Sequence, residues 1–101
     1  MSRSAQFSSQ PALKAAARFG ERVRRARKAQ GRTLADLEAS SRIHRQTLAR
    51  LERGDPTVSF GVALIALECL GQLADIELLV SQPEAARPRA TEDAEPLDRD
   101  F

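Results

Sequence analysis

Three glycines, Gly31, Gly54 and Gly71, divide the middle of the chain into segments in which apolar residues recur at helical spacing. Glycine commonly follows the last turn of a helix, because it adopts the left-handed backbone conformation that ends one. The 101 residues include no Trp or Tyr and only four Phe, so aliphatic side chains must supply the core. The sequence therefore predicts one all-α domain, a compact bundle of four to five helices.

The first two helices are bounded by start and stop signals. Pro11 suits a first helical turn, and the helix that it begins is expected to end at Gly31. Thr33 then opens a second helix with Asp36 three residues further on, the spacing of a capping box in which hydroxyl and carboxylate satisfy unpaired amides. We expect residues 1–10 to form a flexible arm before this helical domain.

The stretch HRQTLARLERGD, residues 44–55, predicts a third helix with His44 as its N-cap. Leu48 and Leu51 share one side of this helix, and Glu52 is the only acid before the closing glycine. The opposite side is crowded with basic and amide side chains, those of Arg45, Gln46, Arg50 and Arg53. Together with the preceding short helix and the turn between them, this stretch has the spacing of a helix-turn-helix.

A fourth helix, FGVALIALECL at residues 60–70, is predicted to begin at the capping residue Ser59 and is apolar on nearly all sides. One side can pack on the first three helices. The other side would be exposed in a monomer, which points to a homodimer or to another protein partner. We place the dimer interface on six apolar residues of this helix and the segment that follows it: Phe60, Leu64, Leu67, Ile76, Leu78 and Val80.

The segment at residues 73–80 allows two interpretations. It forms a further helix, or it forms a short dimerising strand in which Ile76, Leu78 and Val80 alternate against Asp75 and Glu77. The alternation slightly favours the strand. From residue 81 to residue 101, three prolines and many charges predict a disordered acidic tail, so the structured domain is expected to span 11–80.

The charge is distributed unevenly along the chain. Residues 1–58 carry 13 Lys or Arg against five acids, a net charge of +8, whereas residues 59–101 carry three Arg against nine acids, a net charge of −6. A basic front half suggests contact with a polyanion, and the acidic rear half suggests a different partner. The alternative is a pair of solvated faces.

Composition argues against several classes of function. Cys69 is the only cysteine, so the chain can form neither an internal disulfide nor a Cys-rich zinc site, and we expect a cytoplasmic protein. The longest purely apolar run, Val62 to Leu67, is far too short to cross a bilayer. The glycines form no phosphate-binding loop, and His44 is interpreted as a structural cap or a phosphate contact rather than a catalytic residue. We therefore expect that the protein is not an enzyme. We also expect no catalytic residue, no bound metal, no cofactor and no contact with a membrane.

From Phe19 to about Gly71 the chain resembles the phage-repressor (Xre or Cro/CI) class of helix-turn-helix proteins. Four features carry the resemblance at family spacing, namely the end of the first helix at residues 27–31, Leu37 in the second, Ile43 at the turn, and LARLERGDPTVS from the third helix onward. In that family the second short helix lies in the DNA major groove, and its outward residues contact base edges.

The resemblance implies roles for individual residues. The positions that would face bases in double-stranded DNA are Arg45, Gln46, Ala49 and Arg50, and both Arg and Gln can form paired hydrogen bonds with a base. The candidates for phosphate contacts are Arg22, Arg25, Lys28, Arg32, Arg42, His44, Thr47 and Arg53. The pair formed by Arg27 and Glu52 matches the family's partly buried ion pair, which ties the first helix to the end of the recognition helix.

The chain departs from this family at four positions. Most relatives have Gln in place of Leu34 and a small Ala in place of Glu38. The usual glycine of the turn is Arg42 here, and a common Leu is Arg32. These departures leave open how the protein holds phosphate: Arg32 or Arg42 replaces the missing contact, or the domain docks on DNA in an unusual way.

The family resemblance implies a sequence-specific transcriptional repressor that binds a palindromic operator as a dimer, with half-sites about 34 Å apart. The stretch ERGDPTVS, the apolar helix and the acidic tail are also similar to HipB-like antitoxins, which bind a HipA-type kinase toxin and repress their own promoter. The alternative is a protein-binding module with little DNA specificity, which the departures at Leu34 and Glu38 motivate.

Overall fold

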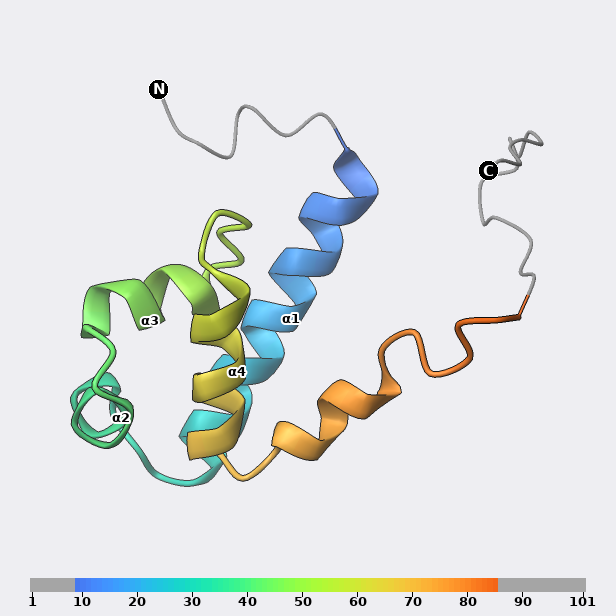
Figure 1. Cartoon of the computed structure of the whole chain (residues 1–101). Helices are drawn as coiled ribbons and strands as arrows, with labels where there is room; N and C mark the ends of the chain where they lie inside the picture. The colour runs from blue at the N-terminus through green and yellow to red at the C-terminus, as the bar shows by residue number, and fades with distance from the viewer. Residues whose placement is uncertain (1–8, 86–101) are drawn as a thin grey trace.

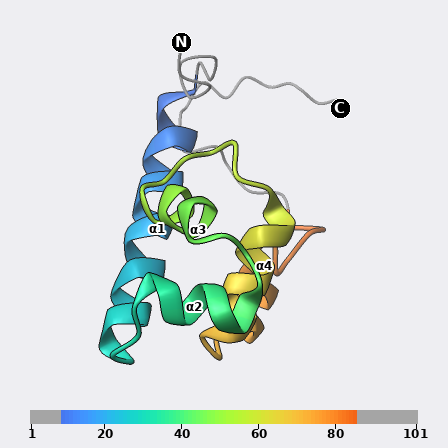
Figure 2. The same ribbon diagram turned by 90° about the vertical axis from the view of Figure 1, so that its left-hand side faces the viewer.

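The computed structural model describes residues 9–85, and the regular secondary structure in this part of the chain is all helical (Figure 1). Within that range lie five elements: α1 (Gln10–Ala29), α2 (Leu34–Ser41), α3 (Arg45–Glu52), α4 (Phe60–Cys69) and the 3₁₀-helix η2 (Leu73–Leu78). The long helix α1 runs along one side of the domain, and α2 crosses below α3 in the view of Figure 2. The prediction of a small all-α domain with a helix-turn-helix is confirmed.

Each of the four α-helices begins at a residue whose side chain accepts a hydrogen bond from a backbone amide of the first turn. Thr33 and Asp36 form the predicted capping box, with distances of 3.0 Å from the Asp36 amide to Thr33 Oγ1 and 2.8 Å from the Thr33 amide to Asp36 Oδ2. His44 caps α3 through Nδ1, and Ser59 caps α4 through Oγ. These three predictions from local sequence are confirmed, because a cap depends only on residues within one turn.

An aliphatic core joins all four α-helices. Leu37 of α2 and Leu48 of α3 are completely buried, and they pack with side chains from α1 and α4. The other buried members of this core are Val23, Leu51, Ala63, Ala66 and Leu70. Because α2 and α3 are only eight residues each, their stability comes from this packing rather than from helix propensity.

A close approach between α1 and the end of α3 depends on Gly20. A Cβ atom built there would lie 2.6 Å from the carbonyl oxygen of Glu52 and 2.8 Å from the amide nitrogen of Gly54, and it would also collide with the carbonyl oxygen of Leu51. These neighbours are backbone atoms that cannot rotate away. The absence of a side chain at Gly20 therefore sets the distance between α1 and the recognition helix.

The slight preference for a strand at residues 73–80 was wrong. Residues 73–78 form η2. The amide of Asp75 donates to the carbonyl of Gln72 at 3.1 Å, and the amide of Leu79, which follows η2, donates to the carbonyl of Ile76 at 3.1 Å. A strand needs a neighbouring strand for its backbone hydrogen bonds, and residues 9–85 offer none. The short helix instead satisfies these groups locally.

The predicted boundaries at the ends can be compared with the structure only in part. α1 already begins at Gln10, so the helical domain includes one residue of the expected arm at 1–10. The segment 81–85 contains a turn and is exposed. Ser9 of the predicted arm caps α1, whereas residues 1–8 of the arm and 86–101 of the predicted acidic tail at 81–101 lie outside the described residues.

We expect substitution of Gly20 by Ala to destabilise the domain by about 2 kcal/mol or more, because the added methyl group forces α1 away from α3. Chemical unfolding followed by circular dichroism measures this loss. Gly61→Ala is the matched control: its added Cβ meets no atom closer than Ser59 Oγ at 3.9 Å, so helix propensity should stabilise it by about 0.5–1 kcal/mol. Equal stability of the two variants would contradict the close-packing argument.

Candidate nucleic-acid interface

A buried ion pair fixes the back of α3 against α1. Arg27 Nε donates to Glu52 Oε2 at 2.7 Å and Arg27 Nη2 donates to Glu52 Oε1 at 2.9 Å, and the two side chains are only 8% and 6% exposed. Arg27 Nη1 also donates to the carbonyl of Arg32 at 2.9 Å. The hydrogen bond with Glu52 raises the pKa of Arg27 above its ordinary value. The pair thus connects α1, the α1–α2 loop and α3.

The outward side of α3 carries the residues expected to contact bases. Arg45 and Gln46 are exposed, Ala49 and Arg50 are half-buried, and Leu48 is buried on the opposite side. Together with α2, α3 forms the side of the domain that faces the viewer in Figure 2. The structure therefore brings these four residues together on one helix, with its apolar side locked into the core.

Arg45 is paired with a residue of the neighbouring helix α2. Its Nε donates to Glu38 Oε1 at 2.8 Å, with the two side chains 57% and 29% exposed. The hydrogen bond from Arg45 holds the pKa of Glu38 below its ordinary value, so this carboxylate stays ionised at neutral pH. The Glu that replaces the family's small Ala therefore has a defined partner.

Arg50 is held by the loop that follows α3. Its Nε donates to Asp55 Oδ2 at 2.9 Å, and its Nη2 donates to Thr57 Oγ1 at 2.9 Å. Asp55 also accepts hydrogen bonds from the Thr57 hydroxyl at 2.6 Å and from the Thr57 amide at 2.9 Å. These bonds from Thr57 and then the bond from Arg50 lower the pKa of Asp55 to about 2.

The turn between α2 and α3 places Arg42 in the left-handed backbone region, with φ of 64°. Its amide donates to the carbonyl of Glu38 at 2.8 Å and so ends α2. This is the position where the related proteins have glycine, which explains that preference. The exposed side chain of Arg42 and that of the capping residue His44 both lie at the start of α3.

Arg32 has an internal role that the sequence did not reveal. Its Nη1 donates to the carbonyl of Cys69 at 2.7 Å, and its Nη2 donates to Ser40 Oγ at 2.8 Å. Gln30 Nε2 donates in the same region to the carbonyl of Leu70 at 2.9 Å. The two side chains satisfy carbonyls at the end of α4, which the helix itself leaves unpaired. The replacement of the usual Leu by Arg32 was the one signal of this contact.

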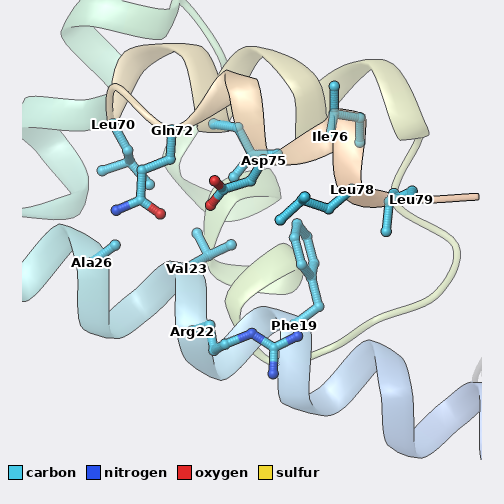
Figure 3. A pocket seen from close by; sticks show the side chains of 11 residues that line it. Phe19, Arg22, Val23, Ala26, Leu70, Gln72, Asp75, Ile76, Leu78 and Leu79 are labelled. Carbon is cyan, nitrogen blue, oxygen red and sulfur yellow. The ribbon is translucent and has the colours of Figure 1, made fainter. Parts of the chain in front are cut away.

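The remaining phosphate candidates are distributed over two helices. On α1, the side chains of Arg22, Arg25 and Lys28 are exposed. Arg22 is one of the residues that line an apolar groove between α1 and η2 (Figure 3). On α3, Thr47 is half-buried, and Arg53 is exposed at the C-terminal end.

The six residues expected at a dimer interface differ in exposure. Phe60, Leu78 and Val80 are 63%, 73% and 81% exposed, which is unusual for large apolar side chains. Leu64 and Ile76 are half-buried. Leu67 instead belongs to the core of its own chain. Three further large apolar residues are exposed, namely Ile65, Leu73 and Leu79.

Two other features, a metal-binding cluster and a membrane-spanning helix, are absent from the described range. Between residues 9 and 85, no group of three or more His, Cys, Asp or Glu side chains is arranged to hold a metal ion. Of the helices in that range, none combines the length and the apolar character that crossing a membrane requires.

The low pKa of Asp55 has a consequence for stability. A carboxyl whose pKa falls from 3.8 in the unfolded chain to about 2 in the folded one stabilises the fold above about pH 4 and loses this effect as pH falls toward 2. We therefore expect Asp55→Asn to be less stable than the wild type near pH 5. Urea unfolding from about pH 5 to about pH 2 should show this difference shrinking as the wild-type carboxyl is protonated. A difference that is independent of pH would contradict the assignment.

Comparison with known proteins agrees with this geometry. A family profile described as helix-turn-helix matches residues 23–76, which is more than half of the chain. No curated protein matches the chain. No solved structure matches it either. The matched region begins within α1 and includes α2, α3, α4 and part of η2. The chain therefore belongs to the helix-turn-helix family of the phage-repressor type, and it is a DNA-binding transcription regulator.

Proposed function

We propose that this regulator is a sequence-specific repressor that binds a palindromic operator as a two-fold dimer, with α3 in the major groove. The observation that carries the proposal is the outward side of α3, where exposed guanidinium and amide groups stand on a helix whose other side is buried. Such a helix can enter the groove without rearranging the core. A dimer bound across a promoter would exclude the transcription machinery.

The chemistry of the outward residues suits base recognition. Arg45 and Arg50 can donate to the two acceptors of guanine, O6 and N7, and Gln46 can form a bidentate pair with adenine. The methyl group of Ala49 can pack on the methyl group of thymine. These four side chains read sequence in the proposed complex.

The surrounding basic residues supply affinity through the phosphate backbone. Arg42 and Arg53 lie near opposite ends of α3, where the two walls of the groove would approach the protein. Lys28 lines a shallow hollow together with Thr33 and Leu34 at the start of α2. In the proposed complex it supplies the phosphate contact that Leu34 cannot make. The same role is proposed for Arg25, His44 and Thr47. We assign Arg32 to the internal contacts with α4.

The dimer is proposed to form through the exposed apolar side chains of α4 and the C-terminal segment, chiefly Phe60, Leu78 and Val80. Covering these groups removes apolar surface from water. A two-fold dimer also presents two copies of α3, so that two weak half-site contacts combine into one strong interaction. This arrangement fits half-sites about 34 Å apart.

An antitoxin role stays a prediction for this chain. The exposed apolar residues could bind a HipA-type kinase toxin, either instead of a second copy of this chain or together with one. A neighbouring gene that encodes a kinase-like toxin would support this role, and the absence of any toxin-like neighbour would count against it. The function that competes with the sequence-specific repressor is a protein-binding module without DNA specificity. The DNA-binding experiment below distinguishes the repressor from this module.

Base readout and phosphate contact make different predictions for two residues of α3. A preferred duplex is first selected from random DNA, and affinities for it and for a shuffled duplex are measured by fluorescence anisotropy at several salt concentrations. Gln46→Ala should weaken binding to the preferred duplex by about 1–3 kcal/mol and leave the salt dependence unchanged. Arg53→Ala should weaken binding to both duplexes and lower the salt slope by about one. A wild-type protein without preference would refute sequence-specific repression.

The proposed dimer can be tested without DNA. Val80→Asp and Phe60→Asp each place a charge on an exposed apolar position, so both should shift sedimentation equilibrium from dimer to monomer while the circular dichroism spectrum is retained. Gln72→Asp, on an exposed polar residue beside η2, adds the same charge and is the control. A wild-type protein that sediments as a monomer at high concentration would rule the dimer out.

A further inference from the structure

Both arginines expected to read bases are held by a carboxylate that comes from outside α3. We propose that Glu38 and Asp55 are positioning residues that set the sequence selectivity of the regulator by orienting Arg45 and Arg50 toward guanine. This inference rests on the proposed function, because it concerns how that function achieves its specificity. It explains why two acidic side chains lie on the surface that is proposed to bind DNA, which is a polyanion.

The contacts of Arg50 leave one particular side of its guanidinium group open. A guanidinium presents five N–H donors in a planar fork, with one edge formed by Nε and a terminal nitrogen, and another by the two terminal nitrogens. Asp55 and Thr57 accept from Nε and Nη2, which occupies the first edge. In the described part of the chain Nη1 has no hydrogen-bond partner. The terminal edge is therefore available to a pair of acceptors.

Arg45 repeats this arrangement at the N-terminal end of α3. Its Nε donates to Glu38, and within residues 9–85 neither terminal nitrogen is engaged in a further hydrogen bond. Two parallel donors on a rigid plane match O6 and N7 of guanine. Because the partners come from α2 in one case and from the loop after α3 in the other, the two guanidinium groups are oriented independently.

A stabilising role alone explains Glu38 poorly. The Arg45 side chain is 57% exposed and that of Glu38 is 29% exposed, and ion pairs open to solvent contribute little to stability. Each carboxylate also repels the DNA backbone and so lowers the general attraction to nucleic acid. Acids in this position weaken binding to every sequence, and they are favourable for a regulator that needs discrimination more than affinity.

The physical gain lies in the restricted motion of the arginines. An unpaired arginine on a helix surface samples many rotamers, and it can reach a phosphate or a neighbouring base instead of the intended one. A carboxylate that holds Nε removes most of these alternatives before DNA arrives, so less conformational entropy is lost on binding the correct base. The wrong base gains no comparable advantage, because it lacks the matching acceptors.

Glu38→Gln tests the inference, with affinities measured for the selected duplex, for that duplex with each guanine replaced in turn, and for a shuffled duplex. We expect affinity for the shuffled duplex to rise, because one negative charge is removed, and the ratio of selected to shuffled affinity to fall about tenfold. The lost preference should be confined to one guanine in each half-site. Thr57→Val, which removes one contact of Arg50 without changing the charge, should relax a different guanine.

Glu77→Gln is the control for charge, since Glu77 is exposed on η2, away from α2 and α3 (Figure 1). It makes the same change in net charge and should leave the ratio unchanged. In an Arg45→Ala background, Glu38→Gln should no longer alter base preference, because a positioning residue acts only through its partner. Thermal melts of each variant verify that the fold is retained.

The possible results distinguish a failure of the proposed function from a failure of the positioning role. A wild-type protein with no preference for any sequence overturns the proposed function. A selective wild-type protein whose preference survives unchanged in folded Glu38→Gln and Thr57→Val variants overturns the positioning role alone. A fall in selectivity of Glu38→Gln that persists in the Arg45→Ala background also overturns it, since Glu38 would then act by another route.

Discussion

The buried ion pair between Arg27 and Glu52 is the interaction on which the arrangement of the domain depends. It joins α1 to the last turn of the recognition helix through two parallel hydrogen bonds, and the third bond of Arg27 reaches the loop before α2. Removing one partner from such a pair costs about 3–5 kcal/mol, because the other charge is left buried without compensation. Two charges thus connect three segments in addition to the apolar core that they share.

This constraint also explains how so small a core can support a rigid surface. Gly20 allows the backbone of α1 to approach the end of α3, and the ion pair about two helical turns further along α1 fixes the rotation of the two helices. Leu48 fills the remaining space. The orientation of the outward side of α3 is therefore determined by the contacts on its inner side.

Much of this could be predicted from the sequence, and the rest depended on geometry between elements. The caps at Thr33, His44 and Ser59 follow from residues within one turn, and the family spacing implied the pairing of Arg27 with Glu52. The contact between Glu38 and Arg45 spans a turn, so it depends on the angle at which α2 meets α3. The segment after α4 was misjudged, because alternating residues form a strand only where another strand is available.

The pairing of the two arginines proposed to read bases with acids from other elements has a consequence for how such a regulator diverges. After a gene duplication, a change of Arg45 alone would leave Glu38 facing the phosphate backbone with no partner, and a change of Arg50 alone would do the same to Asp55. New operator preferences would then be reached most readily by joint replacement of an arginine and its acid. Among descendants of this chain, the two members of each pair should accordingly vary together, whereas Gln46 should vary by itself.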